Sequence, residues 1–98
     1  MAETPHPLLA AVMPLVDRVG AKNVAYVSLA GTVNMAGGQP VSMENVKALR
    51  AFGDRNGIKV YLDATRMVEN AFFIQEREAG YDRKSIAQIL KEFCGYTD

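Results

Sequence analysis

The feature that most constrains the fold is an alternation of strand-like and helix-like segments in the middle of the sequence. Asn23 to Leu29 is a short apolar run rich in β-branched and aromatic residues, which predicts a buried strand, and Ile58 to Leu62 predicts a second short strand. Between them, Met43 to Asn56 carries apolar residues on one helical face. This order predicts a right-handed crossover between parallel neighbours. We therefore expect an α/β fold with a partial parallel sheet and crossover helices.

Local signals mark the ends of the two expected N-terminal helices. Leu8 to Val19 has apolar positions at helical spacing, Pro14 either kinks this helix or starts its second half, and Gly20 is a suitable stop. Ser42 is the expected N-cap of the central helix, and Gly57 stands where a helix commonly ends. Both helices are therefore predicted from sequence neighbours alone.

The remaining segments follow the same rules. Glycines and proline crowd residues 31–40, which predicts a loop that leaves the carboxyl end of the first strand. A third helix is expected from Val68 to Glu78, ended by Gly80, and a fourth follows Ser85, whose spacing to Gln88 matches a capping box. No internal repeat interrupts this organisation.

Composition excludes several classes of function. Eleven basic residues balance eleven acidic ones, so the positive charge that nucleic acid or an anionic membrane attracts is missing. Cys94 is the only cysteine, which excludes an internal disulfide framework and fits a reducing compartment. The first six residues lack the pattern of an export signal, and the apolar run from Val24 to Gly31 is too short to span a membrane. We expect a soluble, cytoplasmic protein.

Ligands of open parallel sheets bind outside the carboxyl ends of the strands. Here that edge carries the loop with Asn34 and the turn Asp63-Ala64-Thr65-Arg66. An acid directly after an apolar strand can pair with a cationic ligand group, cap the next helix or hold a metal. The spacing leaves these alternatives open.

Longer strings carry a resemblance to a known family. They are Asn23-Val24-Ala25-Tyr26, Thr32-Val33-Asn34, Ala36-Gly37-Gly38-Gln39-Pro40-Val41-Ser42, Lys59-Val60-Tyr61-Leu62-Asp63-Ala64-Thr65-Arg66 and Glu69-Asn70-Ala71-Phe72-Phe73-Ile74. In order and spacing they resemble the middle of the β-eliminating lyases of the tyrosine phenol-lyase and tryptophanase type. The resemblance is strongest over residues 20–98. The turn 63–66 and Lys84-Ser85-Ile86 look closer to tyrosine phenol-lyase, while the residues that select phenol or indole lie outside this segment.

The resemblance implies that residues 1–98 are part of the pyridoxal-phosphate-binding large domain of a fold-type-I enzyme. The complete enzyme would be a homo-oligomer that cleaves an aromatic amino acid to pyruvate, ammonia and a phenol or indole. Asp63 matches the aspartate that pairs with the protonated pyridine nitrogen of the cofactor. Asn34 and Arg66 match the residues that hydrogen-bond its 3′ oxygen, and Arg66 is also the expected catalytic residue.

The resemblance also implies which parts of the enzyme lie elsewhere. In this family the lysine that forms the Schiff base follows the strand after the last expected helix, beyond Asp98, and the phosphate-binding and ring-stacking segments precede residue 1. The lysines of this sequence are not obvious substitutes; they are Lys22, Lys47, Lys59, Lys84 and Lys91. We therefore expect the separate chain to be inactive.

Other candidate residues are expected to be structural. Gly37 and Gly38 lack the spacing of a P-loop and are expected to be turn residues that position Asn34. His6 has no partner at metal-ligand spacing, so no metal is expected, and Cys94 is expected to be a buried small hydrophobic residue. Residues 72–74 are interpreted as core or subunit contact.

Two alternative hypotheses are also compatible with parts of the sequence. A small binding or signalling domain of the receiver type could use Asp63 as a phosphate acceptor, but the residues that follow the first strand, Ala30-Gly31-Thr32, lack the acidic pair of such a fold. A non-catalytic truncated product is the other alternative, and the sequence does not separate it from the first interpretation.

Overall fold

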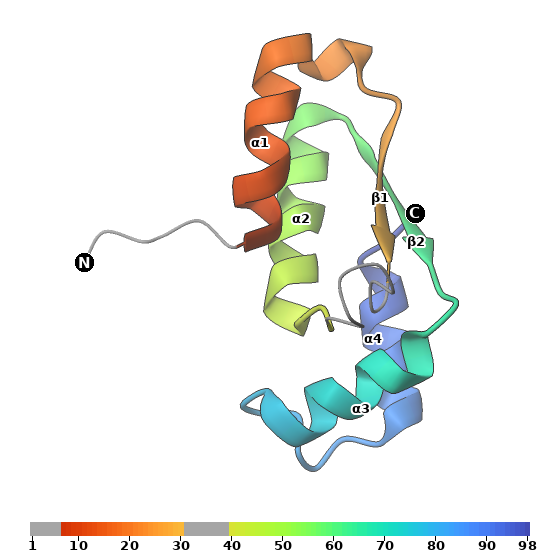
Figure 1. Cartoon of the computed structure of the whole chain (residues 1–98). Helices are drawn as coiled ribbons and strands as arrows, with labels where there is room; N and C mark the ends of the chain where they lie inside the picture. Colours follow the sequence, from red (N-terminus) through yellow and green to blue (C-terminus); the bar gives the residue numbers. More distant parts are fainter. Residues whose placement is uncertain (1–6, 31–39) are drawn as a thin grey trace, which may run out of the picture.

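The computed structural model describes residues 7–30 and 40–98. In chain order the elements are α1 (Pro7–Val19), the 3₁₀ helix η1 (Ala21–Asn23), β1 (Tyr26–Ala30), α2 (Met43–Asn56), β2 (Lys59–Asp63), α3 (Met67–Arg77) and α4 (Ile86–Gly95). Figure 1 shows α1 beside α2, the two strands next to this helix pair, and α3 and α4 at the carboxyl end of the strands. The order confirms the expected strand, helix and strand.

The two strands are parallel, and their carboxyl ends lie together. Tyr26 is paired with Lys59 at the start of the ladder, and Ala30 with Asp63 at its end. The first strand begins three residues later than expected, because Asn23 belongs to η1 and its amide donates to the carbonyl of Gly20. The second begins one residue later, at Lys59, since the amide of Ile58 donates to the carbonyl of Gly53 in the last turn of α2.

Only one face of this sheet is buried. Leu29 and Val60 are enclosed on the face that the helices cover, with exposed fractions of 4% and 0%. On the opposite face the rings of Tyr26 and Tyr61 stack with centroids 4.5 Å apart, and each residue stays about half exposed. The prediction of a buried first strand therefore holds for its inner face at Leu29 and is wrong for its outer face at Tyr26, because the described residues place no element over that face.

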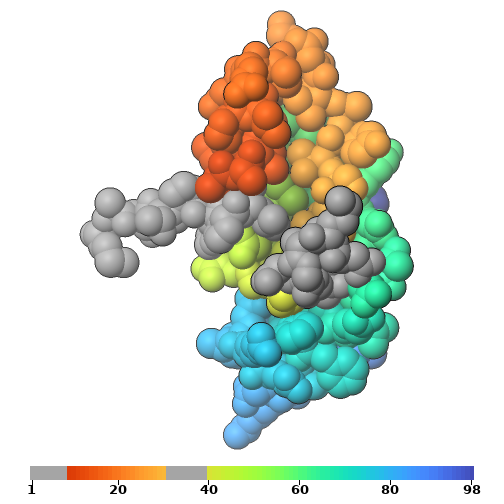
Figure 2. Space-filling view, in the orientation of Figure 1, coloured from red at the N-terminus to blue at the C-terminus, as the bar shows by residue number. Residues whose placement is uncertain are grey.

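The core lies between the buried sheet face and three helices. Its buried side chains are Leu29, Val41, Met43, Val46, Leu49, Val60, Met67, Ala71, Ile74, Tyr81, Ile89 and Phe93. A smaller cluster of Val16, Phe52 and Ile58 joins α1 to α2. Figure 2 shows α1 at one end of the molecule and α3 at the other, so the carboxyl edge of the sheet faces the α3 end.

The central helix has the predicted bounds. The Ser42 hydroxyl accepts the amide hydrogen of Asn45 at 3.1 Å, which caps the first turn. Gly57 ends the helix with φ of 66°, a left-handed conformation that favours glycine. Gly53 allows the helix to approach β2, because a Cβ there would lie 2.6 Å from the carbonyl oxygen of Ile58.

The other helices agree with the predictions to within one residue at each end. The first continues through Pro14 and stops at Gly20, whose φ is 86°. The capping box is present at the start of α4, where Ser85 and Gln88 each accept the other's amide hydrogen. No helix in the described part of the chain is long and apolar enough to cross a membrane.

Candidate functional site

Two of the predicted site residues, Asp63 and Arg66, are described by the structure and stand at the carboxyl edge of the sheet. Asp63 is the last residue of β2, and Arg66 is the N-cap of α3 three residues later. The parallel register brings Ala30, where β1 ends, opposite Asp63. Asn34, Gly37 and Gly38 lie outside the described residues.

The carboxylate of Asp63 is oriented by Thr65. Its Oδ1 accepts the Thr65 amide hydrogen at 3.1 Å and the Thr65 hydroxyl at 2.5 Å. This is a turn motif in which an aspartate holds the main chain two residues ahead. Asp63 does not cap α3, whose N-cap is Arg66 with no side-chain cap bond. No described residue donates to Oδ2, which leaves this oxygen available to a ligand.

These contacts favour the ionised form of Asp63. The hydrogen bond from the Thr65 hydroxyl, followed by the one from its amide, lowers the pKa of the Asp63 carboxyl below its ordinary value. The side chain is exposed, so water also solvates the charge. At neutral pH the edge of the sheet therefore presents a negative charge directly after β2.

Arg66 carries a positive charge three residues after Asp63 in the chain. Its guanidinium donates to Glu69 at 3.2 Å, and its side chain is 44% exposed. An exposed pair at this spacing contributes little to stability, so a ligand oxygen can compete with Glu69 for the guanidinium. The carbonyl of Arg66 accepts the amide hydrogen of Asn70 at 3.1 Å, which starts α3.

Thr65 and Asn70 support this turn and were not singled out from the sequence. An Asp-x-Thr order is a known turn signal, so Thr65 could have been found there. Asn70 stands three residues after Met67, on the helical face that buries Ala71 and Ile74. A polar residue at an apolar position of a helix was the available signal for it.

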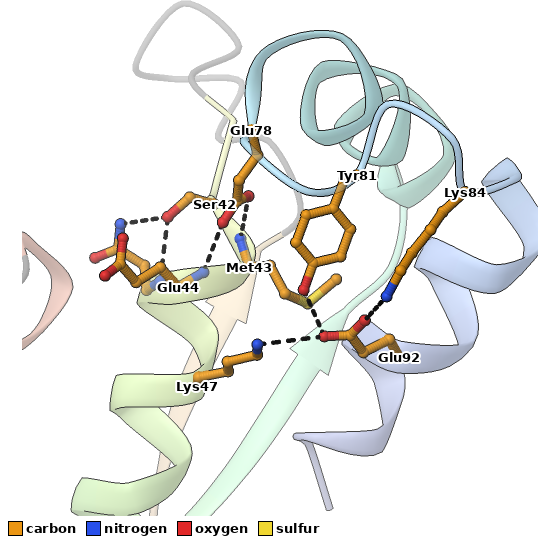
Figure 3. A network of polar contacts seen from close by, with 9 residues as sticks. Ser42, Met43, Glu44, Lys47, Glu78, Tyr81, Lys84 and Glu92 are labelled. Carbon is orange, nitrogen blue, oxygen red and sulfur yellow. Dashed lines mark hydrogen bonds and ion pairs between the residues drawn. The ribbon is translucent and has the colours of Figure 1, made fainter.

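A polar network fixes the far end of α3 to α2 and α4 (Figure 3). Both oxygens of Glu78 accept amide hydrogens at the start of α2, from Met43 at 2.7 Å and Glu44 at 3.0 Å. A carboxylate stabilises the positive end of a helix dipole in this way. The structure thereby joins the start of α2 to the end of α3.

Glu92 on α4 is the centre of the second half of this network. It accepts the Tyr81 hydroxyl at 2.7 Å and lies 3.3 Å from the ammonium of Lys84 and 3.6 Å from that of Lys47 (Figure 3). Burial raises the pKa of the Glu92 carboxyl, but hydrogen bonds from Tyr81 and Lys84 outweigh this and lower it overall. These two lysines are thus engaged in structural contacts.

The structure also describes Cys94 and residues 72–74, for which the sequence predicted structural roles. Cys94 is exposed, so the prediction of a buried cysteine is wrong. The reason is that α4 buries Ile89 and Phe93, and Cys94 projects about 100° away from Phe93. In residues 72–74, Ile74 is in the core, Phe73 is covered by Arg77 at 4.7 Å from its ring centre, and Phe72 is half exposed.

A cavity of about 320 Å³ opens between the start of α2 and the end of α3. Its lining residues are Pro40, Val41, Ser42, Glu44, Phe73, Ile74, Arg77, Glu78 and Ala79. Neither Asp63 nor Arg66 lines it. The described residues also contain no group of three histidine, cysteine or acidic side chains placed to hold a metal ion.

Comparison with known proteins gives one family. The sequence profile of the family described as beta-eliminating lyase matches residues 4–98. A tyrosine phenol-lyase of Nostoc punctiforme is 52% identical over 102 aligned positions, which cover 99% of this chain and 22% of that protein. Those of Fusobacterium nucleatum and Symbiobacterium thermophilum are 60% and 57% identical over 84 positions, covering 86% of this chain and 18% of each protein. The chain thus spans about a fifth of the length of these relatives.

Proposed function

This chain belongs to the beta-eliminating lyase family, and from that membership we propose that it forms part of the pyridoxal-phosphate-binding domain of a lyase. The complete enzyme cleaves an aromatic amino acid by β-elimination. We favour tyrosine as the substrate, with phenol, pyruvate and ammonia as products, because the relatives above are tyrosine phenol-lyases. A tryptophanase-like substrate is the alternative. We further propose that the complete enzyme is a homo-oligomer and is located in the cytoplasm.

The observation that carries this proposal is the state of Asp63. It is an ionised carboxylate at the carboxyl end of a parallel strand, and one of its oxygens is held by Thr65. The second oxygen faces no donor among the described residues. A fixed negative charge of this kind suits the protonated ring nitrogen of pyridoxal phosphate.

Arg66 and Asn34 complete the proposed set of cofactor-binding residues. Arg66 would donate a hydrogen bond to the 3′ oxygen of the bound ring, and Asn34 is proposed for the same oxygen. Bound pyridoxal phosphate supplies an electron-accepting ring that stabilises negative charge on the substrate. Asp63 keeps a proton on the ring nitrogen by favouring its charged form, and Arg66 acts as the catalytic donor at the 3′ oxygen.

Substitutions at Asp63 test the proposal in a complete lyase that carries residues 1–98 in place of its own matching segment. Asp63→Ala and Asp63→Asn should lose almost all formation of pyruvate from tyrosine, since neither keeps the charge. Asp63→Glu keeps the charge at a shifted distance and should retain part of the activity. This order separates an electrostatic role from a packing role.

Asp82→Asn is the matched control, because Asp82 is an exposed aspartate in the loop before α4. It should leave the rate of pyruvate formation unchanged. Turnover of Asp63→Asn close to the parental rate, with cofactor still bound, would show that the assigned role of Asp63 is wrong.

We also propose that the separate 98-residue chain lacks lyase activity. The described lysines lie on helices, at the start of β2 or in the loop before α4. Borohydride reduction after mixing with pyridoxal phosphate should therefore label no single lysine stoichiometrically. Peptide mass mapping detects such labelling, and one fully labelled lysine would contradict the proposal.

A further inference from the structure

Asn70 is fully buried on the side of α3 that faces the core. Among the described residues it is the only buried side chain that carries an amide or a charge. Its Oδ1 accepts the Val41 amide hydrogen at 2.7 Å, and its Nδ2 donates to the Val41 carbonyl at 2.8 Å. A buried amide is unfavourable without such partners. The side chain of Asn70 thus satisfies both main-chain polar groups of one distant residue.

The main chain of Asn70 is hydrogen-bonded to the turn of residues 63–66, called the site turn below. Its amide donates to the carbonyl of Arg66, and the amide of Met67 donates to that of Ala64 at 3.2 Å. The first turn of α3 therefore continues directly from the turn that carries Asp63. Asn70 links this turn to Val41, which lies 29 positions earlier in the sequence.

Val41 is itself held in place. It is buried and precedes Ser42, the N-cap of α2. The carboxylate of Glu78 accepts the amide hydrogens of Met43 and Glu44, the two residues after Ser42, as Figure 3 shows. The segment that Asn70 binds is therefore fixed from α2 and from the end of α3. Loss of the Asn70 side chain would release the site turn from a fixed support.

We propose that Asn70 is a positioning residue of the cofactor site. It fixes the turn of residues 63–66 against Val41, so that Asp63 and Arg66 keep the geometry that the cofactor needs. This inference rests on the proposed function above. Asn70 acts through the main chain of Arg66 and not through contact with a ligand. Since a displacement of about 1 Å can cost up to roughly a hundredfold in rate, we expect a loss of about tenfold to a hundredfold on removal of its amide.

The first test uses the cofactor-free form of the complete lyase that carries residues 1–98. Asn70→Leu keeps the size of the side chain but removes both hydrogen bonds. Hydrogen exchange followed by mass spectrometry should become faster in peptides that contain Val41 and in those that contain residues 64–67. Ile74→Ala is the matched control, because Ile74 is buried one turn further along α3. Equal acceleration of these peptides in both variants overturns the proposal.

The second test uses the same lyase with cofactor bound. Asn70→Leu and Ile74→Ala are compared after their thermal midpoints have been measured. Only Asn70→Leu should raise the cofactor dissociation constant and lower kcat, by about tenfold to a hundredfold. Losses that simply follow the thermal midpoint in both variants would assign Asn70 a structural role and overturn the proposal.

Asn70→Asp is a second variant, and its effect on hydrogen exchange at Val41 should depend on pH. A protonated carboxyl can accept from the Val41 amide and donate to its carbonyl, whereas the ionised form repels that carbonyl. Exchange at Val41 should therefore be close to parental at low pH and exceed it as the pH rises. A pH-independent difference overturns the proposal. The exchange tests need no cofactor, so unimpaired catalysis in Asp63→Asn would reject the proposed function alone.

Discussion

Asp98 pairs with Val60 through both its main chain and its side chain. Its amide donates to the Val60 carbonyl at 2.8 Å, and its Oδ2 accepts the Val60 amide hydrogen at 2.7 Å. Arg50 donates to the same oxygen at 2.8 Å. Figure 1 shows the C-terminus next to β2. Because β1 occupies the other side of β2, Asp98 satisfies polar groups at the edge of the sheet, where unpaired groups promote association.

Asp98→Asn should make the chain less stable at neutral pH. The hydrogen bond from Arg50, followed by that from the Val60 amide, lowers the pKa of the Asp98 carboxyl in the folded state. A lowered pKa contributes stability that is complete above the unfolded-state pKa and is lost as the pH falls through the folded-state pKa. The urea midpoint of the variant should therefore lie below the parental one at neutral pH.

The difference between the two midpoints should shrink in acid. Asp82→Asn removes the same charge from an exposed loop and should leave the midpoint close to the parental value at each pH. A gap between Asp98→Asn and the parent that stays constant from neutral to acid pH would rule out this role of the carboxylate.

We predict that the isolated chain is weakly stable and self-associates through the sheet face that no described element covers. Parallel sheets are normally covered on both faces, and here Tyr26 and Tyr61 are about half exposed. Tyr61→Thr introduces a β-branched residue, which suits a strand, and removes the aromatic surface. Sedimentation velocity at a low and a high concentration should show less association for this variant.

Phe72→Ser is the comparison for the self-association, because Phe72 is an exposed aromatic residue on α3. It should reduce association less than Tyr61→Thr. Concentration-independent, two-state unfolding of a parental monomer would contradict the prediction as a whole.

The sequence predicted those features whose causes are local. Both ends of helix α2 agree with the prediction, because its N-cap Ser42, its C-cap Gly57 and the apolar spacing between them are all local signals. The strand at Asn23 was wrong at its start, because a 3₁₀ turn closes on Gly20 and the Asn23 side chain bonds to the Val19 carbonyl. The residue pattern at the start of this segment is compatible with either a strand or a short 3₁₀ helix.

The contacts that support the site were not predictable in the same way. Asn70 meets Val41 and Asp98 meets Val60 across 29 and 38 positions, so only the folded chain defines these pairs. The place of Asp63 at the carboxyl end of β2 was predictable, because an apolar run ends there. The role of Asn34 stays a prediction, since it lies outside the described residues.

Tyr81→Phe should lower the free energy of unfolding by about 1 kcal/mol, the usual contribution of one hydrogen bond. The ring remains in the core, and only the hydroxyl that donates to Glu92 is removed. Urea unfolding measures the difference. Tyr96→Phe is the control, because the Tyr96 hydroxyl makes no hydrogen bond within the described part of the chain and its ring stays near Lys47. Equal losses in both variants would contradict the contribution assigned to the Tyr81 hydroxyl.

Thr65→Val should raise the pKa of the Asp63 carboxyl towards its ordinary value. The Thr65 hydroxyl is the largest cause of the lowered pKa, and valine keeps the β-branched shape without a donor. The amide of residue 65 can still donate to Oδ1, so part of the shift should remain. Titration of the Asp63 carboxyl carbon by NMR measures the change.

Thr65→Ser separates the hydroxyl from the shape of the side chain. Serine keeps the donor, so the pKa of Asp63 should stay low in this variant although a methyl group is lost. The contribution of Asp63 to stability, present above its unfolded-state pKa and lost as the pH falls through its folded-state pKa, should be smaller in Thr65→Val than in Thr65→Ser. If the carboxyl titrated at the same pH in the parent and in both variants, Thr65 would not be the residue that holds Asp63 ionised. The orientation of its free oxygen towards a ligand would then need another cause.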